Sequence, residues 1–255
     1  MDRCRVLFCL HAVSAVLMAS VSLLPAIVQA QPARQYIQYS SGTGFFINRE
    51  GHVITNAHVV KSCQNIELRT ADGTTAASLV AKDDTRDLAV LKASRIPGTV
   101  APLRWNIKAL QVGNPLYLYG YPGQRGSAGQ PTFSRTKLAG LLGPSGEPEW
   151  LQLESVAQQG NSGGPVLDGS GNVIAVISGR AETYRTPTSA GGKPTLVSKA
   201  DVAITLTALE EFLNRNQVTY YQSSSGLVAL ADPILQRNAS RFVVNVRCLQ
   251  GTVYK

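Results

Sequence analysis

The chain has 255 residues, of which 44% are hydrophobic, and a formal net charge of +8. This length suits one large domain or two small ones that bury a sizeable core. The lysines and arginines are scattered, without a basic run or an alternation with aromatic residues. We therefore interpret the charge as a solvated surface and expect no specific nucleic-acid partner.

The N-terminus has the pattern of a secretory signal peptide. Arg3 and Arg5 precede an apolar run over 6–28, and Val28-Gln29-Ala30 places small residues at a cleavage position. We expect residues 1–30 to be removed, which leaves an exported chain, periplasmic or secreted, with no membrane partner. The apolar run is also long enough for an uncleaved anchor, which is the alternative.

Two cysteines, Cys63 and Cys248, remain after the expected cleavage. An even pair in an exported chain predicts a disulfide. The alternative is two buried free thiols.

Short apolar segments separated by turns follow the leader and predict an all-β fold. Residues 97–115 contain three prolines and two glycines and suit a connection between two β units. Leu206, Leu209 and Leu213 share one face of a helix predicted at 205–214. The polar segment 180–199, rich in glycine, proline and threonine, predicts a long exposed loop.

Three residues have the chemistry of nucleophilic catalysis. A serine hydroxyl needs a base with a pKa near neutrality, and a histidine imidazole meets this need. His58 lies in VITNAHVV, at the end of a predicted strand. The imidazole needs a carboxylate on its other nitrogen, and Asp87 begins the apolar strand DLAVLK. Ser162 follows in QQGNSGGPV. The order His58, Asp87, Ser162 predicts a catalytic triad.

The glycines around Ser162 predict a pocket for a developing oxyanion. Gly160 allows backbone angles that other residues resist. The N–H groups of Gly160 and Ser162 are the expected donors to the carbonyl oxygen of a substrate.

With these motifs the chain resembles the trypsin/chymotrypsin-like serine peptidases, most closely the bacterial Deg (high-temperature-requirement) branch. The resemblance rests on TNAHVV, DLAVLK and GNSGGP, together with the upstream SGTGFFI at 41–47, and covers roughly 36–215. It implies two six-stranded antiparallel β-barrels, about 36–103 and 110–200, in a protease domain over 31–215. It also implies no cofactor, and hydrolysis of protein or peptide substrates through an acyl-enzyme, with the substrate bound as an added strand.

Two features depart from that branch. Only 40 residues follow Arg215, too few for the PDZ module that Deg peptidases usually carry, so we expect 216–255 to be a short C-terminal extension. Val156 stands where trypsin-like members with basic specificity have aspartate. With Ser178 and Gly179 as further pocket residues, we expect cleavage after small or medium apolar residues such as Val, Ala or Leu.

Other functions remain as alternatives. The same fold could bind peptides without hydrolysing them, if the loop at 180–199 closed the cleft. Gly160 and Gly164 satisfy the G-x-S-x-G pattern of esterases, but both the histidine and the acid precede Ser162, against the order of that fold. The few histidines predict no metal site. The sequence leaves the oligomeric state open.

Overall fold

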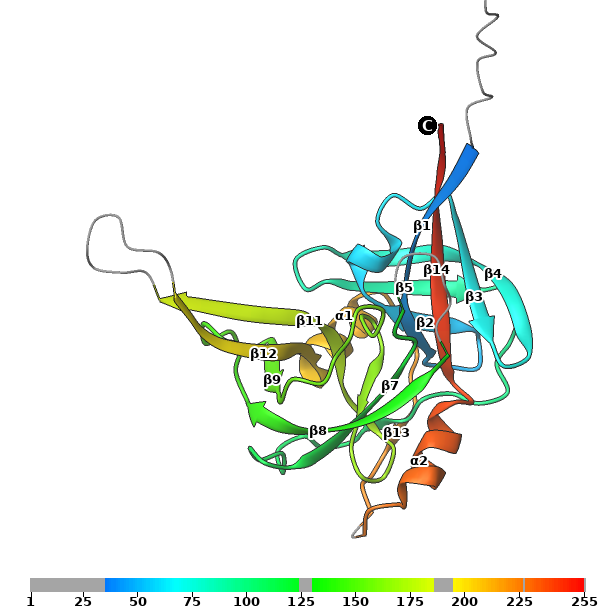
Figure 1. The fold of residues 1–255 in the computed structure, drawn as a ribbon. Helices are drawn as coiled ribbons and strands as arrows, with labels where there is room; N and C mark the ends of the chain where they lie inside the picture. Colours follow the sequence, from blue (N-terminus) through cyan, green and yellow to red (C-terminus); the bar gives the residue numbers. More distant parts are fainter. Residues whose placement is uncertain (1–34, 124–129, 186–194, 227, 255) are drawn as a thin grey trace, which may run out of the picture. The chain divides into compact units, whose positions relative to one another are not determined.

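The structure is a computed structural model that describes residues 35–123, 130–185, 195–226 and 228–254. The expected signal peptide, 1–30, lies outside the described residues. Within them, no helix is both long and apolar enough to cross a membrane. Strands dominate the fold (Figure 1), and the elements in chain order are β1 Gln35–Phe46, β2 His52–Thr55, the 3-10 turn η1 Ala57–Val60, β3 Asn65–Thr70, β4 Gly73–Asp83, β5 Leu88–Ala93, β6 Leu103–Arg104, β7 Pro115–Gly120, β8 Thr132–Gly140, β9 Trp150–Leu153, β10 Pro165–Leu167, β11 Val173–Arg185, β12 Thr195–Thr205, α1 Leu206–Arg215, β13 Gln222–Ser223, α2 Asp232–Ala239 and β14 Val243–Tyr254.

The strands form two closed barrels of six antiparallel strands each, which confirms the predicted fold class. The first barrel has the order β1-β14-β3-β4-β5-β2. The second has the order β10-β7-β8-β9-β12-β11 and closes through the pairing of β10 with β11. Outside this ring, the short strand β6 pairs in parallel with β11, and β13 pairs in parallel with β6.

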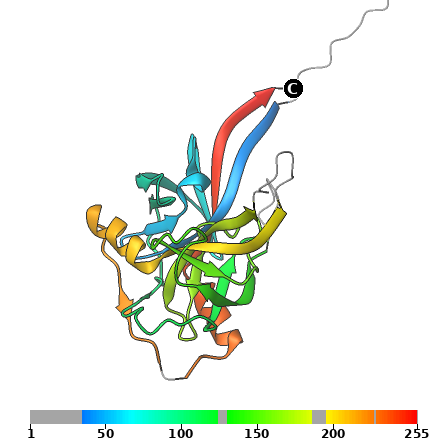
Figure 2. The same ribbon diagram turned by 90° about the vertical axis from the view of Figure 1, so that its left-hand side faces the viewer.

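The first barrel contains a strand from the far end of the chain. β14 pairs with β1 on one side and with β3 on the other, so it lies between them (Figures 1 and 2). The segment 216–255 is therefore not an appendage: it supplies one of the six barrel strands and α2. The other five strands of this barrel lie within 35–93, and the second barrel lies within 115–205.

Three apolar clusters fill the fold. One lies inside the first barrel around Val53, Leu91 and Val246, and another lies inside the second barrel around Leu138 and Ile174. The third joins strands of both barrels with α1 and includes Phe45, Ile54, Tyr117, Leu167, Val176, Leu209 and Phe212. This shared core holds the two barrels together, because burying apolar side chains stabilises their contact.

α1 lies within one residue of its predicted bounds at each end. Thr205 caps its N-terminus by accepting a hydrogen bond from Ala208 N. Leu206, Leu209 and Leu213 are buried, as the spacing predicted, and Phe212 is buried as well.

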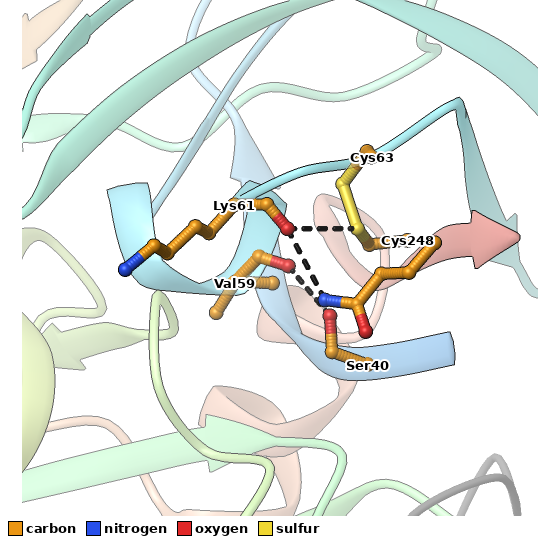
Figure 3. Close-up of a disulfide and its surroundings, with 6 residues drawn as sticks. Ser40, Val59, Lys61, Cys63 and Cys248 are labelled. Atoms are coloured by element: carbon orange, nitrogen blue, oxygen red, sulfur yellow. Dashed lines mark hydrogen bonds between the residues drawn. A yellow bond between two sulfur atoms is a disulfide. The ribbon is translucent and has the colours of Figure 1, made fainter. Parts of the chain in front are cut away.

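The pair Cys63 and Cys248 forms a disulfide with a Cα–Cα distance of 5.2 Å, within the usual range. It joins the segment after η1 to β14 (Figure 3). Beside it, Ser40 Oγ donates to Val59 O at 3.0 Å and Gln250 Nε2 donates to Lys61 O at 3.1 Å. The turn that carries His58 is therefore fastened to both β1 and β14.

Candidate active site

His58 and Asp87 contact each other directly. Nδ1 of His58 lies 2.8 Å from Oδ2 and 3.0 Å from Oδ1 of Asp87. The backbone N–H of His58 also donates to Oδ1 at 3.0 Å. Since Nδ1 faces the carboxylate, Nε2 remains available for proton transfer. The His58 side chain is 50% exposed. A ligand can therefore reach this imidazole.

The backbone of Asp87 is in the left-handed region, with φ at +56°. Few residues other than glycine adopt this conformation, and it costs on the order of 1–3 kcal/mol. The carbonyl of Asp87 accepts hydrogen bonds from Asn56 Nδ2 at 2.8 Å and from Ala57 N at 3.2 Å. These bonds hold the residue in the orientation that directs its carboxylate to His58.

Ser178, on β11 of the second barrel, connects the acid to the serine. Its hydroxyl donates to Oδ2 of Asp87 at 2.6 Å. Its carbonyl accepts a hydrogen bond from Ser162 Oγ at 2.9 Å. Ser178 was predicted only as a residue of the substrate pocket, and its contact with Asp87 is an additional role that no sequence motif indicated.

The pKa of Asp87 is below its ordinary value. Burial raises this pKa, but the hydrogen bonds from His58 and Ser178 lower it by more. The carboxylate is thus ionised at neutral pH and can stabilise a positive charge on the imidazole.

The hydroxyl of Ser162 points to Ser178 rather than to His58. Among the described residues, no hydrogen bond joins Ser162 to His58. Ser178 contacts both Asp87 and Ser162, so the three predicted triad residues lie around one point where the barrels meet. The Ser162 hydroxyl must release Ser178 O before it can donate to the imidazole.

The turn before Ser162 presents two unused donors. The N–H of Asn161 donates to Gln158 O at 3.0 Å, and that of Gly163 donates to Ile177 O at 2.8 Å. In the described part of the chain, the N–H groups of Gly160 and Ser162 have no acceptor. Two such groups two residues apart suit an oxyanion, which is the role predicted for them.

Glycine is required at two positions of this turn. Gly160 has φ at +99°, and a Cβ there would lie 2.5 Å from Tyr121 O. Gly163 has φ at +85°, and a Cβ there would collide with the backbone of Thr43 and the side chain of Thr55. Gly160 and Gly163 therefore allow the turn to pack against its neighbours.

Thr43, buried in β1, braces this turn from the first barrel. Its N–H donates to Ser162 O at 2.8 Å, and its hydroxyl donates to Gly160 O at 2.7 Å. The same hydroxyl accepts from Tyr121 N at 3.0 Å. The motif SGTGFFI contains Thr43, but nothing in the pattern indicated this contact across 117 residues.

The predicted pocket residues lie on two separate segments. Val156 packs its side chain against the core of the second barrel, and its N–H donates to Asp201. Gly179 follows Ser178 on β11, and a Cβ there would meet nothing within 4 Å. Asp201 and its partner Arg180 were not predicted, because their contacts are long-range.

In the described ranges, no three His, Cys, Asp or Glu residues are grouped so that they could hold a metal ion. The second histidine, His52, has Asn48 as its side-chain partner at 2.9 Å.

Comparison with known proteins gives the family. The profile of the trypsin-like peptidase domain matches residues 42–176, and the chain belongs to this family. Within it, the chain is similar to proteins of the Deg branch. A probable periplasmic serine endoprotease, DegP-like, of Bartonella henselae is 30% identical over 150 residues, which are 53% of this chain and 27% of that protein.

Two further proteins are similar to this chain. An uncharacterized protein of Sinorhizobium fredii is 33% identical over 210 residues, which are 82% of this chain and 32% of that protein. A crystal structure of the serine endoprotease from Yersinia pestis matches the fold with a TM-score of 0.51 and 24% identity, over 69% of this chain and 57% of that chain. The chain spans about a third of the length of the curated relatives it matches.

Proposed function

We propose that this chain is an exported serine endopeptidase that hydrolyses protein or peptide substrates through an acyl-enzyme. The observation that supports this most strongly is the position of Ser178. Its hydroxyl donates a hydrogen bond to Asp87, and its carbonyl accepts one from Ser162. Membership of the trypsin-like peptidase family and the DegP-like relatives support the reaction class and the export.

In the proposed mechanism, Nε2 of His58 takes the proton of Ser162 as Oγ attacks the substrate carbonyl carbon. The carbonyl oxygen becomes an oxyanion facing the N–H groups of Gly160 and Ser162. Asp87 remains ionised and stabilises the imidazolium. His58 then gives its proton to the leaving amine, and water hydrolyses the acyl-enzyme by the same transfers in reverse order.

The test is hydrolysis of casein by the purified mature chain. We expect Ser162→Ala and His58→Ala to abolish cleavage while the far-ultraviolet circular dichroism spectrum stays that of the wild type. Cleavage by a purified Ser162→Ala variant at the wild-type rate would refute the proposal.

A second function, peptide binding without hydrolysis on the same fold, is favoured by one observation. Ser162 Oγ is bonded to Ser178 O and not to His58. This function predicts that a peptide binds the wild type and Ser162→Ala with equal affinity and that neither protein cleaves it.

A further inference from the structure

Arg180 links two segments close to Ser162. One is β11 after Ser178, and the other is the loop between β9 and Gly160. Nη2 of Arg180, on β11, donates a hydrogen bond to Ala157 O, in the loop, at 3.0 Å. The guanidinium therefore spans the space between the two segments to which the pocket residues Val156 and Gly179 belong.

The same guanidinium covers a buried carboxylate. Asp201, on β12, is fully buried, and Arg180 Nε donates to its Oδ1 at 3.1 Å. Its Oδ2 accepts from the N–H groups of Val156 and Ala157. Arg180 and Asp201 are direct cross-strand partners. A charge removed from water needs such partners, and Arg180 is the cation among them.

The position of this ion pair relative to Ser162 follows from the chain. Arg180 lies two residues beyond Ser178, or about 7 Å along the strand. Gly179, between them, leaves open space. A substrate side chain that enters between the strand of Ser178 and the loop at Ala157 would therefore meet the Arg180 guanidinium, which bridges these two segments.

We propose that Arg180 determines the primary specificity of the endopeptidase proposed above, on which this inference rests. Its guanidinium closes the deep end of the pocket and masks the carboxylate of Asp201. The wild type then accepts small apolar side chains. Removal of the guanidinium opens the pocket onto a carboxylate that selects Lys or Arg in the substrate.

The experiment compares kcat/KM for peptides that differ only in the residue before the scissile bond, namely Ala, Val, Leu, Met, Lys, Arg or Glu. The wild type is expected to prefer Ala and Val. Arg180→Ala is expected to raise the ratio of kcat/KM for the Lys peptide to that for the Val peptide at least about tenfold. The substrate ammonium would then meet the Asp201 carboxylate instead of the Arg180 guanidinium. Arg104→Ala is the matched control, because Arg104 pairs with the buried Asp168 at 3.5 Å, and it should leave the ratio unchanged.

A carboxylate buried without its cation can impair folding, so the double variant Arg180→Ala/Asp201→Asn is measured as well. It has an open pocket without the charge. We expect its ratio of kcat/KM for the Leu or Met peptide to that for the Ala peptide to be about tenfold higher than in the wild type. The Lys-to-Ala ratio should not rise.

Titration with a fluorophosphonate separates this inference from the proposed function. If the wild type is not labelled, the proposed function fails. If it is labelled, the inference is wrong when the wild type prefers Glu, or when both Arg180 variants keep the wild-type preferences.

Discussion

The hydroxyl of Ser178 lies 2.6 Å from Oδ2 of Asp87, although Ser178 belongs to the second barrel and Asp87 precedes a strand of the first. This contact ties the acid of the proposed triad to the strand whose carbonyl holds Ser162. The relative position of the barrels is therefore fixed at the point where His58 and Ser162 must meet.

Loss of the Ser178 hydroxyl should weaken catalysis. A hydrogen bond to a charged group contributes roughly 1.5–3 kcal/mol. We expect Ser178→Ala to lower kcat by about 10- to 100-fold. The matched control is Ser225→Ala, which removes a hydroxyl bonded to another carboxylate, Asp168, and should leave kcat unchanged. Equal kcat for Ser178→Ala and the wild type would contradict this role.

Replacement of the acid should have a larger effect. Asp87→Asn removes the charge that stabilises the imidazolium and favours the wrong tautomer of His58. We expect kcat to fall by about 10⁴, the loss known for this change in a serine-protease triad. Asp84→Asn is the control, since Asp84 is exposed and pairs with Lys82. A large loss in that control instead would assign the acid to Asp84.

The oxyanion pocket should depend on Gly160. Gly160→Ala forces a Cβ to within 2.5 Å of Tyr121 O, so the turn must shift. Loss of one donor costs roughly 2.7–4 kcal/mol of transition-state stabilisation, so kcat should fall by about 10²–10³. Gly73→Ala has a similar positive φ, +118°, but open space around the new Cβ. It should change stability and not kcat; an equal loss of kcat in both variants would rule out the specific role.

Acid should destabilise the fold partly through Asp87. Its folded pKa is below the value of 3.8 expected for the unfolded chain. Its contribution to stability is therefore fully present above about pH 3.8 and is lost as the pH falls through the folded pKa. We expect urea unfolding between pH 5 and pH 2 to show a steeper loss of stability for the wild type than for Asp87→Asn. Parallel curves for the two proteins would contradict the lowered pKa.

The disulfide should contribute strongly to stability. It closes a loop of 185 residues, for which the chain-entropy estimate is on the order of 5 kcal/mol. We expect the double variant Cys63→Ser/Cys248→Ser to unfold at a lower urea concentration than the oxidised wild type. Reduced wild type, the control, should match the variant. Coincident curves for the oxidised wild type and the variant would show that the bridge adds nothing.

The sequence predicted those parts of the molecule that short local patterns determine. Alternating apolar segments indicated the barrels, and the spacing of Leu206, Leu209 and Leu213 indicated α1. Three motifs identified the residues that the structure gathers around Ser178. In each case the residues that carry the signal are neighbours in the chain.

Contacts between distant segments could not be predicted in this way. β14 reads as an ordinary strand, and nothing in its residues indicates that it pairs with β1 and β3 about 200 positions earlier. The roles of Thr43 and Arg180 likewise depend on partners that only folding brings near. The orientation of the Ser162 hydroxyl is a side-chain rotation, which no residue pattern specifies.

Labelling by a fluorophosphonate, followed by peptide mapping, tests most directly whether His58 activates Ser162. We expect the purified mature wild type to form one adduct, on Ser162, and His58→Ala to form it far more slowly or not at all. An unlabelled wild type, or labelling of Ser162 at the same rate without His58, would contradict the proposed mechanism.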